Sequence, residues 1–290
     1  MITVNKAWDR SPYRVFINEV RKSDVCIDKR KSDINYDALF TEVGIETVSL
    51  CNNDCSFCPV STQNDTRPTI FMSDAVFNSI ISQLKNLQFK GTVFPYINNE
   101  FLIDKKIFKR ISHIRNELDG AVRIHLETNG KLLNYEKLVK LYESGVNQVV
   151  INDYADSFID YFLFSKKVRN IIKLLKNKPI SVTGLLVVQH RLKKQILNNR
   201  FGKVLGITDK IPENKFCDFP FFQLNINPSG DVFICCRDSY YEGKIENIHN
   251  MTVEKIWHCE EYKAIRKGFM LNERILNICK KCTSSGSCSM

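Results

Sequence analysis

Three cysteines in the first fifth of the chain have a spacing suited to a metal cluster. Cys51, Cys55 and Cys58 form a Cys-x3-Cys-x2-Cys pattern in the segment CNNDCSFC. Three thiolates so close together can bind three irons of a [4Fe–4S] cluster and leave the fourth iron open to another ligand. A zinc site is the alternative, but zinc typically takes four ligands, and this segment has no nearby His. The spacing therefore favours an iron–sulfur cluster.

The other cysteines are also grouped rather than scattered. Of the 11 cysteines, only Cys26 lies outside residues 51–58 and 217–288. The N-terminal residues contain no apolar run that resembles a signal peptide, so we expect a cytoplasmic protein in a reducing compartment. In such a compartment, grouped cysteines bind metal or do chemistry more often than they form disulfides.

Short apolar runs alternate with helical periodicity along the first two thirds of the chain, and the first run ends at Cys51. This alternation predicts a parallel sheet with right-handed crossovers, either open or rolled into a partial barrel. Five strand–helix units are visible, and we expect a sixth within residues 190–210. The predicted strands are 43–50, 91–97, 121–128, 148–152 and 180–188, and the predicted helices are 73–87, 104–118, 135–143 and 157–175.

The pattern changes after about residue 210. The segments 222–227 and 231–236 flank Pro228, Ser229 and Gly230, which predicts a β-hairpin. A helical stretch over 252–270 and a Cys-rich tail follow. We therefore expect three parts: an N-terminal extension (1–42), an α/β domain (43–210) and a small C-terminal domain (211–290).

The first cysteine loop and the strand ends that follow it resemble the radical S-adenosylmethionine (AdoMet) superfamily. The resemblance implies a partial (β/α)6 TIM-like barrel in which Cys51, Cys55 and Cys58 hold an AdoMet-binding [4Fe–4S] cluster. It also implies that Phe57 packs beside adenine. Asn98, Asn99 and Glu100 stand where the family has a Gly-Gly-Glu element that binds the amino group of AdoMet, and both glycines are replaced. Thr128 and Asn152, at the ends of two predicted strands, match positions that contact the cofactor.

The C-terminal cysteines resemble the auxiliary-cluster modules called SPASM and twitch. The matching pattern is Cys-x12-Gly-x4-Cys followed by Cys-x2-Cys. The shorter twitch form fits better, which implies one auxiliary [4Fe–4S] cluster on Cys217, Cys235, Cys279 and Cys282. A zinc ribbon on the same four cysteines is the alternative. Cys236 and Cys288 are left without an assigned ligand role.

The resemblance implies a radical enzyme that cleaves AdoMet to a 5′-deoxyadenosyl radical and abstracts hydrogen from its substrate. The auxiliary cluster would accept the second electron of an oxidation. Similarity to sugar-modifying members, carried by Asn199, Arg200 and Gly202, implies a sugar- or cyclitol-like substrate that Arg200 contacts. Two alternatives remain open: an enzyme that cross-links, oxidises or epimerises a precursor peptide, and a non-catalytic iron–sulfur or zinc module.

The charge of the chain bears on its partners. Its 42 Lys and Arg against 32 Asp and Glu give a net charge of +10. A basic surface attracts acidic partners, so we expect an acidic electron donor such as flavodoxin or ferredoxin. We expect no nucleic-acid partner, because no binding motif or basic–aromatic stripe is present. The longest apolar stretch, 182–188, is far shorter than the roughly 20 residues that span a membrane, so we expect no membrane partner.

Overall fold

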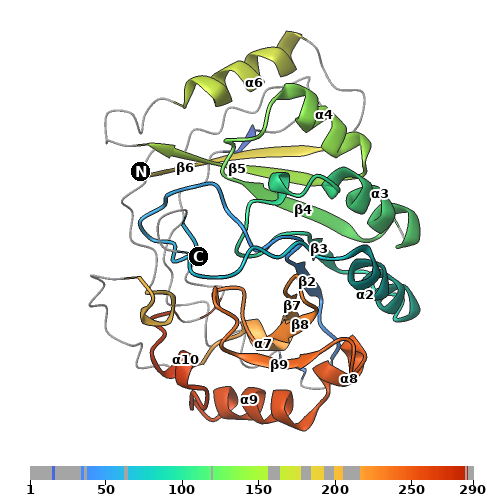
Figure 1. Cartoon of the computed structure of the whole chain (residues 1–290), viewed down its shortest axis with the longest axis vertical. Coiled ribbons are helices and arrows are strands. Elements are labelled where there is room, and N and C mark those ends of the chain that lie inside the picture. The colour runs from blue at the N-terminus through green and yellow to red at the C-terminus, as the bar shows by residue number, and fades with distance from the viewer. Residues whose placement is uncertain are drawn as a thin grey trace.

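One mixed sheet runs through both halves of the chain (Figure 1). The computed structural model describes residues 15–16, 34–35, 38–61, 65–118, 120–155, 164–177, 184–192, 199–204, 216–284 and 286. Within these residues the sheet has nine strands in the order β1-β6-β5-β4-β3-β2-β7-β8-β9. The strands are β1 Val15–Phe16, β2 Glu42–Ile45, β3 Thr92–Phe94, β4 Arg123–Thr128, β5 Gln148–Ala155, β6 Leu185–Leu192, β7 Gln223–Ile226, β8 Asp231–Phe233 and β9 Lys244–Asn247.

All pairings from β1 through to β7 are parallel, whereas β7, β8 and β9 pair antiparallel. The predicted α/β class is therefore confirmed, and so is the predicted hairpin, as β7 and β8. The helices are α2 Asp74–Asn86, α3 Ile107–Glu117, α4 Tyr135–Glu143, α6 Lys166–Asn177, α7 Phe219–Phe222, α8 Val253–Trp257, α9 Glu260–Met270 and α10 Asn277–Lys280, with 3₁₀ turns η1 Phe101–Ile103 and η2 Arg200–Gly202.

Alternation of side chains along the parallel strands gives the sheet one apolar and one largely polar face. The apolar face belongs to the main core, which the buried sides of α2, α3, α4 and α6 complete. Its strand residues are all at most 1% exposed: Val43, Val93, Ile124, Leu126, Val149, Ile151, Leu186 and Val188. The opposite face carries Glu42 and Gly44 on β2, His125 and Glu127 on β4, and Asn152 on β5. This second face is the one available for chemistry.

Each predicted element before residue 190 overlaps one in the structure, and α4 matches its predicted range of 135–143. The predicted strand 43–50 ends early, at Ile45, and α6 begins at Lys166, while residues 156–163 of the predicted helix 157–175 lie outside the described residues. Ser73 caps α2, since its side chain accepts a hydrogen bond from the Val76 backbone N–H at 3.1 Å. The prediction of one helix over 252–270 was wrong. The chain breaks at His258 and Cys259, where Cys259 is extended, and two helices result.

The sixth strand–helix unit expected in 190–210 does not form in the described part of that stretch. There β6 continues to Leu192 and residues 199–204 make the turn η2, while 193–198 and 205–210 lie outside the described residues. The position beside β6 is taken by β1, from the predicted N-terminal extension. The predicted boundary at 210–211 also lies outside the described residues.

The C-terminal module (residues 216–286) extends the sheet instead of standing apart from it. Its first strand, β7, pairs in parallel with β2, with Val43 opposite Leu224 and Ile45 opposite Ile226. In Figure 1 this module lies at the opposite end of the molecule from α6. Among the described helices, none is long and apolar enough to cross a membrane.

Trp257 ties the C-terminal module to the segment before β2. Its side chain is fully buried, its indole N–H donates to the Ala38 carbonyl at 2.9 Å, and its ring meets Phe40 edge-on at 5.3 Å. On its other side the Arg266 guanidinium carbon lies 3.9 Å from the ring centroid. A large side chain at the junction of three segments fixes their relative positions.

We predict that Trp257→Ala lowers the free energy of unfolding by about 3–5 kcal/mol, because it opens a cavity and removes a buried hydrogen bond. Urea unfolding followed by circular dichroism measures the change. Leu271→Ala is the matched control, since Leu271 is 63% exposed and its loss should change stability by at most about 0.5 kcal/mol. Equal effects of the two substitutions would contradict the proposed role of Trp257.

Candidate functional site

The three predicted cluster ligands lie together in the loop that follows β2. Cys55 is 6% exposed and accepts a hydrogen bond from the Asn53 side-chain amide at 2.9 Å. Burial, with the nearby Cys58 and Cys51 thiols, raises the pKa of Cys55 to about 12. Burial likewise raises the pKa of Cys51 to about 11, to which Glu100 and Cys58 contribute. Each thiol therefore lies within electrostatic range of the others, as ligands of one cluster must.

Glu100 braces the loops that surround these cysteines. Its carboxylate is 1% exposed and accepts hydrogen bonds from the Thr128 hydroxyl at 3.0 Å, the Asn129 N–H at 2.9 Å and the Leu102 N–H at 3.3 Å. Its own backbone N–H donates to the Leu50 carbonyl at 3.0 Å. Burial raises the pKa of Glu100, and these donors oppose the shift. Glu100 and Thr128 thus connect the loops after β2, β3 and β4.

Asn129 is a functional candidate that the site prediction left out. Its side-chain amide donates to the Asn52 side chain at 2.8 Å and lies 3.7 Å from the Cys51 sulfur. Hydrogen bonds to ligand sulfur tune iron–sulfur clusters. The signal was present in the sequence, since Asn129 follows Thr128 at the strand end.

Asn98 and Asn99 have different environments. The Asn98 side chain is 5% exposed and joins the two halves of the molecule, because its oxygen accepts from Ser239 at 3.3 Å and its amide donates to the Asp238 carbonyl at 3.4 Å. The Asn99 oxygen accepts from the Ile97 N–H at 2.9 Å. The buried Asn99 amide nitrogen has no hydrogen-bond partner among the described residues. A buried donor of this kind fits a residue that binds a polar cofactor group.

Phe57 lies beside β5, and Asn152 lies within that strand. The Phe57 ring, 7% exposed, lies 6.0 Å from the Tyr154 ring, and Tyr154 is also near the Cys55 thiol. The Asn152 amide donates to the Glu127 carboxylate at 3.2 Å. The structure therefore places Phe57 in the cysteine loop with Tyr154 as its neighbour, and Asn152 beside Glu127.

Arg200 lies between the α/β half and the C-terminal module. Its Nη1 donates to the Asn98 side-chain oxygen at 3.2 Å. The hydrogen bond with Cys235 is the main cause that lowers the pKa of Cys236, and the charges of Arg237 and then Arg200 add to the shift. Arg200 and Phe201 both have positive φ, 44° and 59°, a region that L residues seldom adopt. From this turn the Arg200 side chain reaches Asn98 in the loop after β3.

A second group of polar side chains lies at the polar face of the sheet. Burial, followed by the nearby Glu127 charge, raises the pKa of Tyr96, and Cys236 also lies within electrostatic range of Tyr96. The His125 ring stacks on Tyr96 at 6.4 Å, and its Nε2 lies 3.5 Å from Glu127. The Glu127 side chain is 34% exposed. We name Tyr96, His125 and Glu127 the polar trio; the sequence analysis missed all three.

Sequence reasoning also missed a buried ion pair beneath the cysteine loop. Glu46, fully buried, accepts from Arg67 at 2.9 Å and from the Tyr241 hydroxyl at 2.7 Å. Its second oxygen accepts from the Asn98 N–H at 3.1 Å. Burial raises the pKa of Glu46, and the Arg67 charge opposes the shift. The three side chains come from the residue directly after β2, the segment after the cysteine loop and the C-terminal module.

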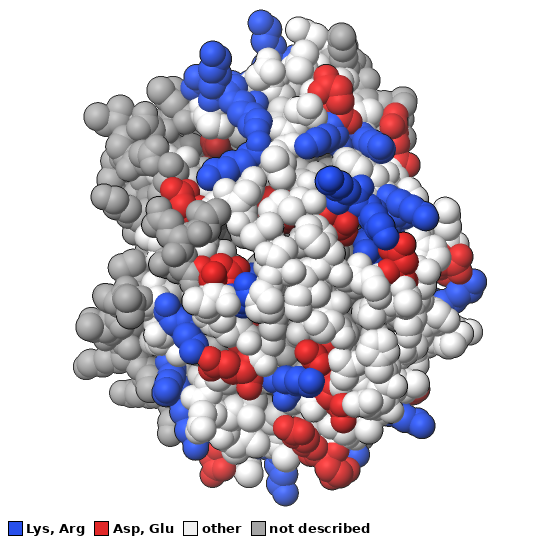
Figure 2. Space-filling view, in the orientation of Figure 1, with Lys and Arg blue, Asp and Glu red and all other residues white. Residues whose placement is uncertain are grey.

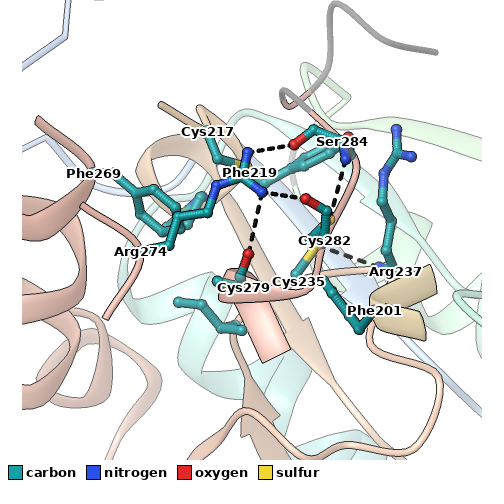
Figure 3. A pocket seen from close by; sticks show the side chains of 12 residues that line it. Phe201, Cys217, Phe219, Cys235, Arg237, Phe269, Arg274, Cys279, Cys282 and Ser284 are labelled. Carbon is teal, nitrogen blue, oxygen red and sulfur yellow. Dashed lines mark hydrogen bonds between the residues drawn. The ribbon is translucent and has the colours of Figure 1, made fainter. Parts of the chain in front are cut away.

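The four predicted auxiliary ligands line one small cavity (Figure 3). Besides Cys217, Cys235, Cys279 and Cys282, its lining residues are Phe201, Phe219, Pro220, Ile234, Phe269, Arg237, Arg274 and Ser284. Burial raises the pKa of Cys279 to about 12 and also raises the pKa of Cys217. Four thiols with two arginines around one apolar-walled cavity fit an anionic [4Fe–4S] cluster.

The remaining cysteines fall outside this set. Cys236 does not line the cavity, although it adjoins Cys235, and Cys259 precedes α9. Cys26 and Cys288 lie outside the described residues. In the described part of the chain, no three His, Cys, Asp or Glu side chains are grouped as the ligands of a single metal ion are.

Comparison with known families matches both halves of the chain. The sequence model of the radical SAM superfamily covers residues 45–192, and that of the SPASM iron–sulfur cluster-binding domain covers residues 217–283. The chain is also 25% identical over 249 residues to the S-adenosyl-L-methionine-dependent 2-deoxy-scyllo-inosamine dehydrogenase of Niallia circulans. That alignment spans 86% of this chain and 94% of the relative.

Solved structures show the same fold. The crystal structure of BtrN in complex with AdoMet and 2-DOIA superposes with a TM-score of 0.66 at 23% identity, over 86% of this chain and 96% of BtrN. The structure of anSMEcpe with bound AdoMet gives a TM-score of 0.52 at 14% identity, over 86% and 88% of the two chains. The radical SAM model spans just over half of the residues of this chain. The chain therefore belongs to the radical SAM superfamily, and its cofactors are AdoMet and two iron–sulfur clusters.

Proposed function

We propose that this chain oxidises a secondary alcohol of a cyclitol- or sugar-like substrate. The observation that carries the proposal is the cavity lined by all four C-terminal cysteines, since a second cluster gives a place for the second electron of an oxidation. The similarity to a dehydrogenase of an aminocyclitol supports this substrate class over the peptide that the sequence also allowed. We also propose that the enzyme acts in the cytoplasm.

Both cofactors have a set of residues suited to them. When bound, AdoMet with its cluster supplies a hydrogen-abstracting radical, and the auxiliary cluster supplies an electron acceptor. Phe57 and Tyr154 form an aromatic wall beside the cysteine loop. The unsatisfied Asn99 amide is a donor for the polar end of AdoMet, while Glu100 and Thr128 hold the surrounding loops in place.

The substrate then lies between the two halves of the molecule, against the polar face of the sheet. Arg200 reaches this region and is held there by Asn98. Its planar fork can hold a substrate hydroxyl, whereas its pKa is too high for it to act as a base. Glu127 is an accessible carboxylate on the same face, so we assign to it the proton that the alcohol loses on becoming a ketone.

Electron delivery to the first cluster needs a docking surface next to the cysteine loop. Lys131 contacts this loop directly, donating to the Asn52 carbonyl at 3.1 Å and lying 3.6 Å from Asp54. Burial and the neighbouring Lys137 charge lower the pKa of Lys167, which also donates to the Lys131 carbonyl. Figure 2 shows Lys and Arg side chains over α4 and α6, where Lys137 and Lys167 lie. We propose that an acidic flavodoxin or ferredoxin docks here.

Separate loss of each cluster tests the assignment of the ligands. After anaerobic reconstitution, Cys55→Ala should keep roughly four irons on the C-terminal cysteines and form no 5′-deoxyadenosine. Cys279→Ala should still form 5′-deoxyadenosine but lose the ketone product. Iron and sulfide analysis with product chromatography measures both. Retention of zinc in place of iron by the Cys55→Ala chain would contradict the auxiliary-cluster assignment.

Arg200→Lys should lower kcat/KM for ketone formation from 2-deoxy-scyllo-inosamine by about a hundredfold, because lysine cannot reproduce the planar fork. The slow formation of 5′-deoxyadenosine without substrate should not change, since Arg200 is not placed at the first cluster. Arg169→Lys on the exposed face of α6 is the matched control. A wild-type kcat/KM in the Arg200 variant would exclude its substrate role.

The docking surface is tested by reversing the charge of two lysines that lie outside the cysteine loop, so that the cluster ligands are left unchanged. Lys137→Glu combined with Lys167→Glu should raise the KM for reduced flavodoxin roughly tenfold at low ionic strength, and added salt should narrow the difference. Activity driven by dithionite should stay the same. Reversal of the exposed Lys255 and Lys267, in α8 and α9, serves as the control. An equal rise of KM in both double variants would show that only net charge matters.

A further inference from the structure

Arg274 is a buried cation in the wall of the auxiliary cavity. It precedes Cys279 by five residues, between α9 and α10, and is 5% exposed. Its Nη1 donates to the Cys279 carbonyl at 3.1 Å and to the Cys282 carbonyl, and its Nη2 donates to the Ser284 carbonyl at 2.7 Å. Figure 3 shows the guanidinium among these three carbonyls, beside the cavity.

These bonds define the shape of the loop that carries two of the four ligands. The guanidinium is rigid and planar, so carbonyls at positions 279, 282 and 284 must all turn toward one point to reach it. Asn199 supports the same loop from outside, by donating to the Lys281 carbonyl at 2.7 Å. With the carbonyls held by Arg274, the Cys279 and Cys282 side chains line the cavity.

The position of the charge has an electrostatic consequence. The guanidinium donates to the carbonyls of two of the four ligand residues and lines the same cavity as their thiols. A [4Fe–4S] cluster with four thiolate ligands is anionic, and one-electron reduction makes it more so. A buried cation interacts strongly with such a charge, because little water is present to screen it. Net charge and hydrogen bonding are among the factors that set cluster potentials.

A second buried arginine in the same module shows what a purely structural role looks like. Arg266 is 1% exposed and lies over the rings of Trp257 and Tyr262, with its Nε donating to the Pro220 carbonyl at 2.8 Å. It does not line the cavity. Arg274 is thus placed differently, at the ligands themselves.

We propose that Arg274 is the positioning residue of the auxiliary site: its fork shapes the Cys279–Cys282 loop for cluster assembly, and its charge favours acceptance of an electron by the cluster. The inference rests on the four-cysteine ligand set of the proposed function. It adds a physical reason why this cluster accepts the electron of the oxidation instead of staying oxidised.

The test uses the full chain with Cys51, Cys55 and Cys58 all replaced by Ala, so that only the auxiliary cluster assembles and AdoMet chemistry plays no part. In this background, Arg274→Gln removes the charge and Arg274→Lys keeps the charge without the fork. Lys280→Gln is the matched control, because it removes an exposed positive charge from between the two ligand cysteines. The readouts are the rate of iron and sulfide incorporation and a reduction titration followed by electron paramagnetic resonance.

We expect Arg274→Gln to assemble the cluster about tenfold more slowly and to shift the reduction equilibrium tenfold toward the oxidised form, which is about 59 mV for one electron. Arg274→Lys should assemble slowly but keep its potential, and Lys280→Gln should match the background chain. If the Gln variant does not fold, slow assembly in Arg274→Lys still tests the fork.

The inference would be overturned if Arg274→Gln assembled its cluster at the rate of the background chain and had the same reduction potential. Equal shifts of the potential in Arg274→Gln and Lys280→Gln would overturn it as well. A wild-type assembly rate in Arg274→Lys would overturn the role of the fork. A background chain that takes up no iron would remove the auxiliary site of the proposed function and this inference with it. Incorporation that is indifferent to residue 274 would leave the proposed function intact.

Discussion

The parallel pairing of β2 with β7 is the constraint on which the arrangement of both cysteine sites depends. β2 leads directly into the loop of Cys51, Cys55 and Cys58, and β7 leads through its hairpin into Cys235. Hydrogen bonds between the two strands therefore fix the starting points of both loops on one rigid sheet. The function proposed above needs such a fixed relation, because its substrate lies between the two sites.

Buried polar groups then hold the loops at this junction. The Glu46 and Arg67 side chains are 0% and 4% exposed and pair at 2.9 Å, with the Tyr241 hydroxyl between the halves of the molecule. Removing one partner of such a pair leaves an uncompensated buried charge, at a cost of about 3–5 kcal/mol. The pair is therefore better understood as a device that fixes geometry than as a source of stability.

The sequence predicted what depends on local spacing. Cysteine intervals, apolar periodicity and the Pro-Ser-Gly turn are all short-range signals, and from them both cysteine sites, most strands and the hairpin were predicted. Contacts between distant residues had no such signal. Glu46 meets Tyr241 across 195 positions, and Glu127 gains importance only through its neighbours Tyr96, after β3, and Asn152, on β5. The β2–β7 pairing was missed for the same reason, since either strand alone is compatible with a separate domain. Whether Phe57, Asn99 and Arg200 contact cofactor or substrate stays a prediction.

Asn98 has a consequence for how the two halves can change over evolution. Its amide side chain accepts hydrogen bonds from Arg200 and Ser239 and donates one to the Asp238 carbonyl. The α/β half, the turn η2 and the C-terminal module are therefore connected through this one side chain. A change at any one of these positions alters the hydrogen bonding of the others. The C-terminal module therefore cannot be exchanged independently of the rest of the chain. Recombination with a relative would have to transfer residue 98 together with residues 200 and 238–241, and we expect substitutions at these positions to be correlated.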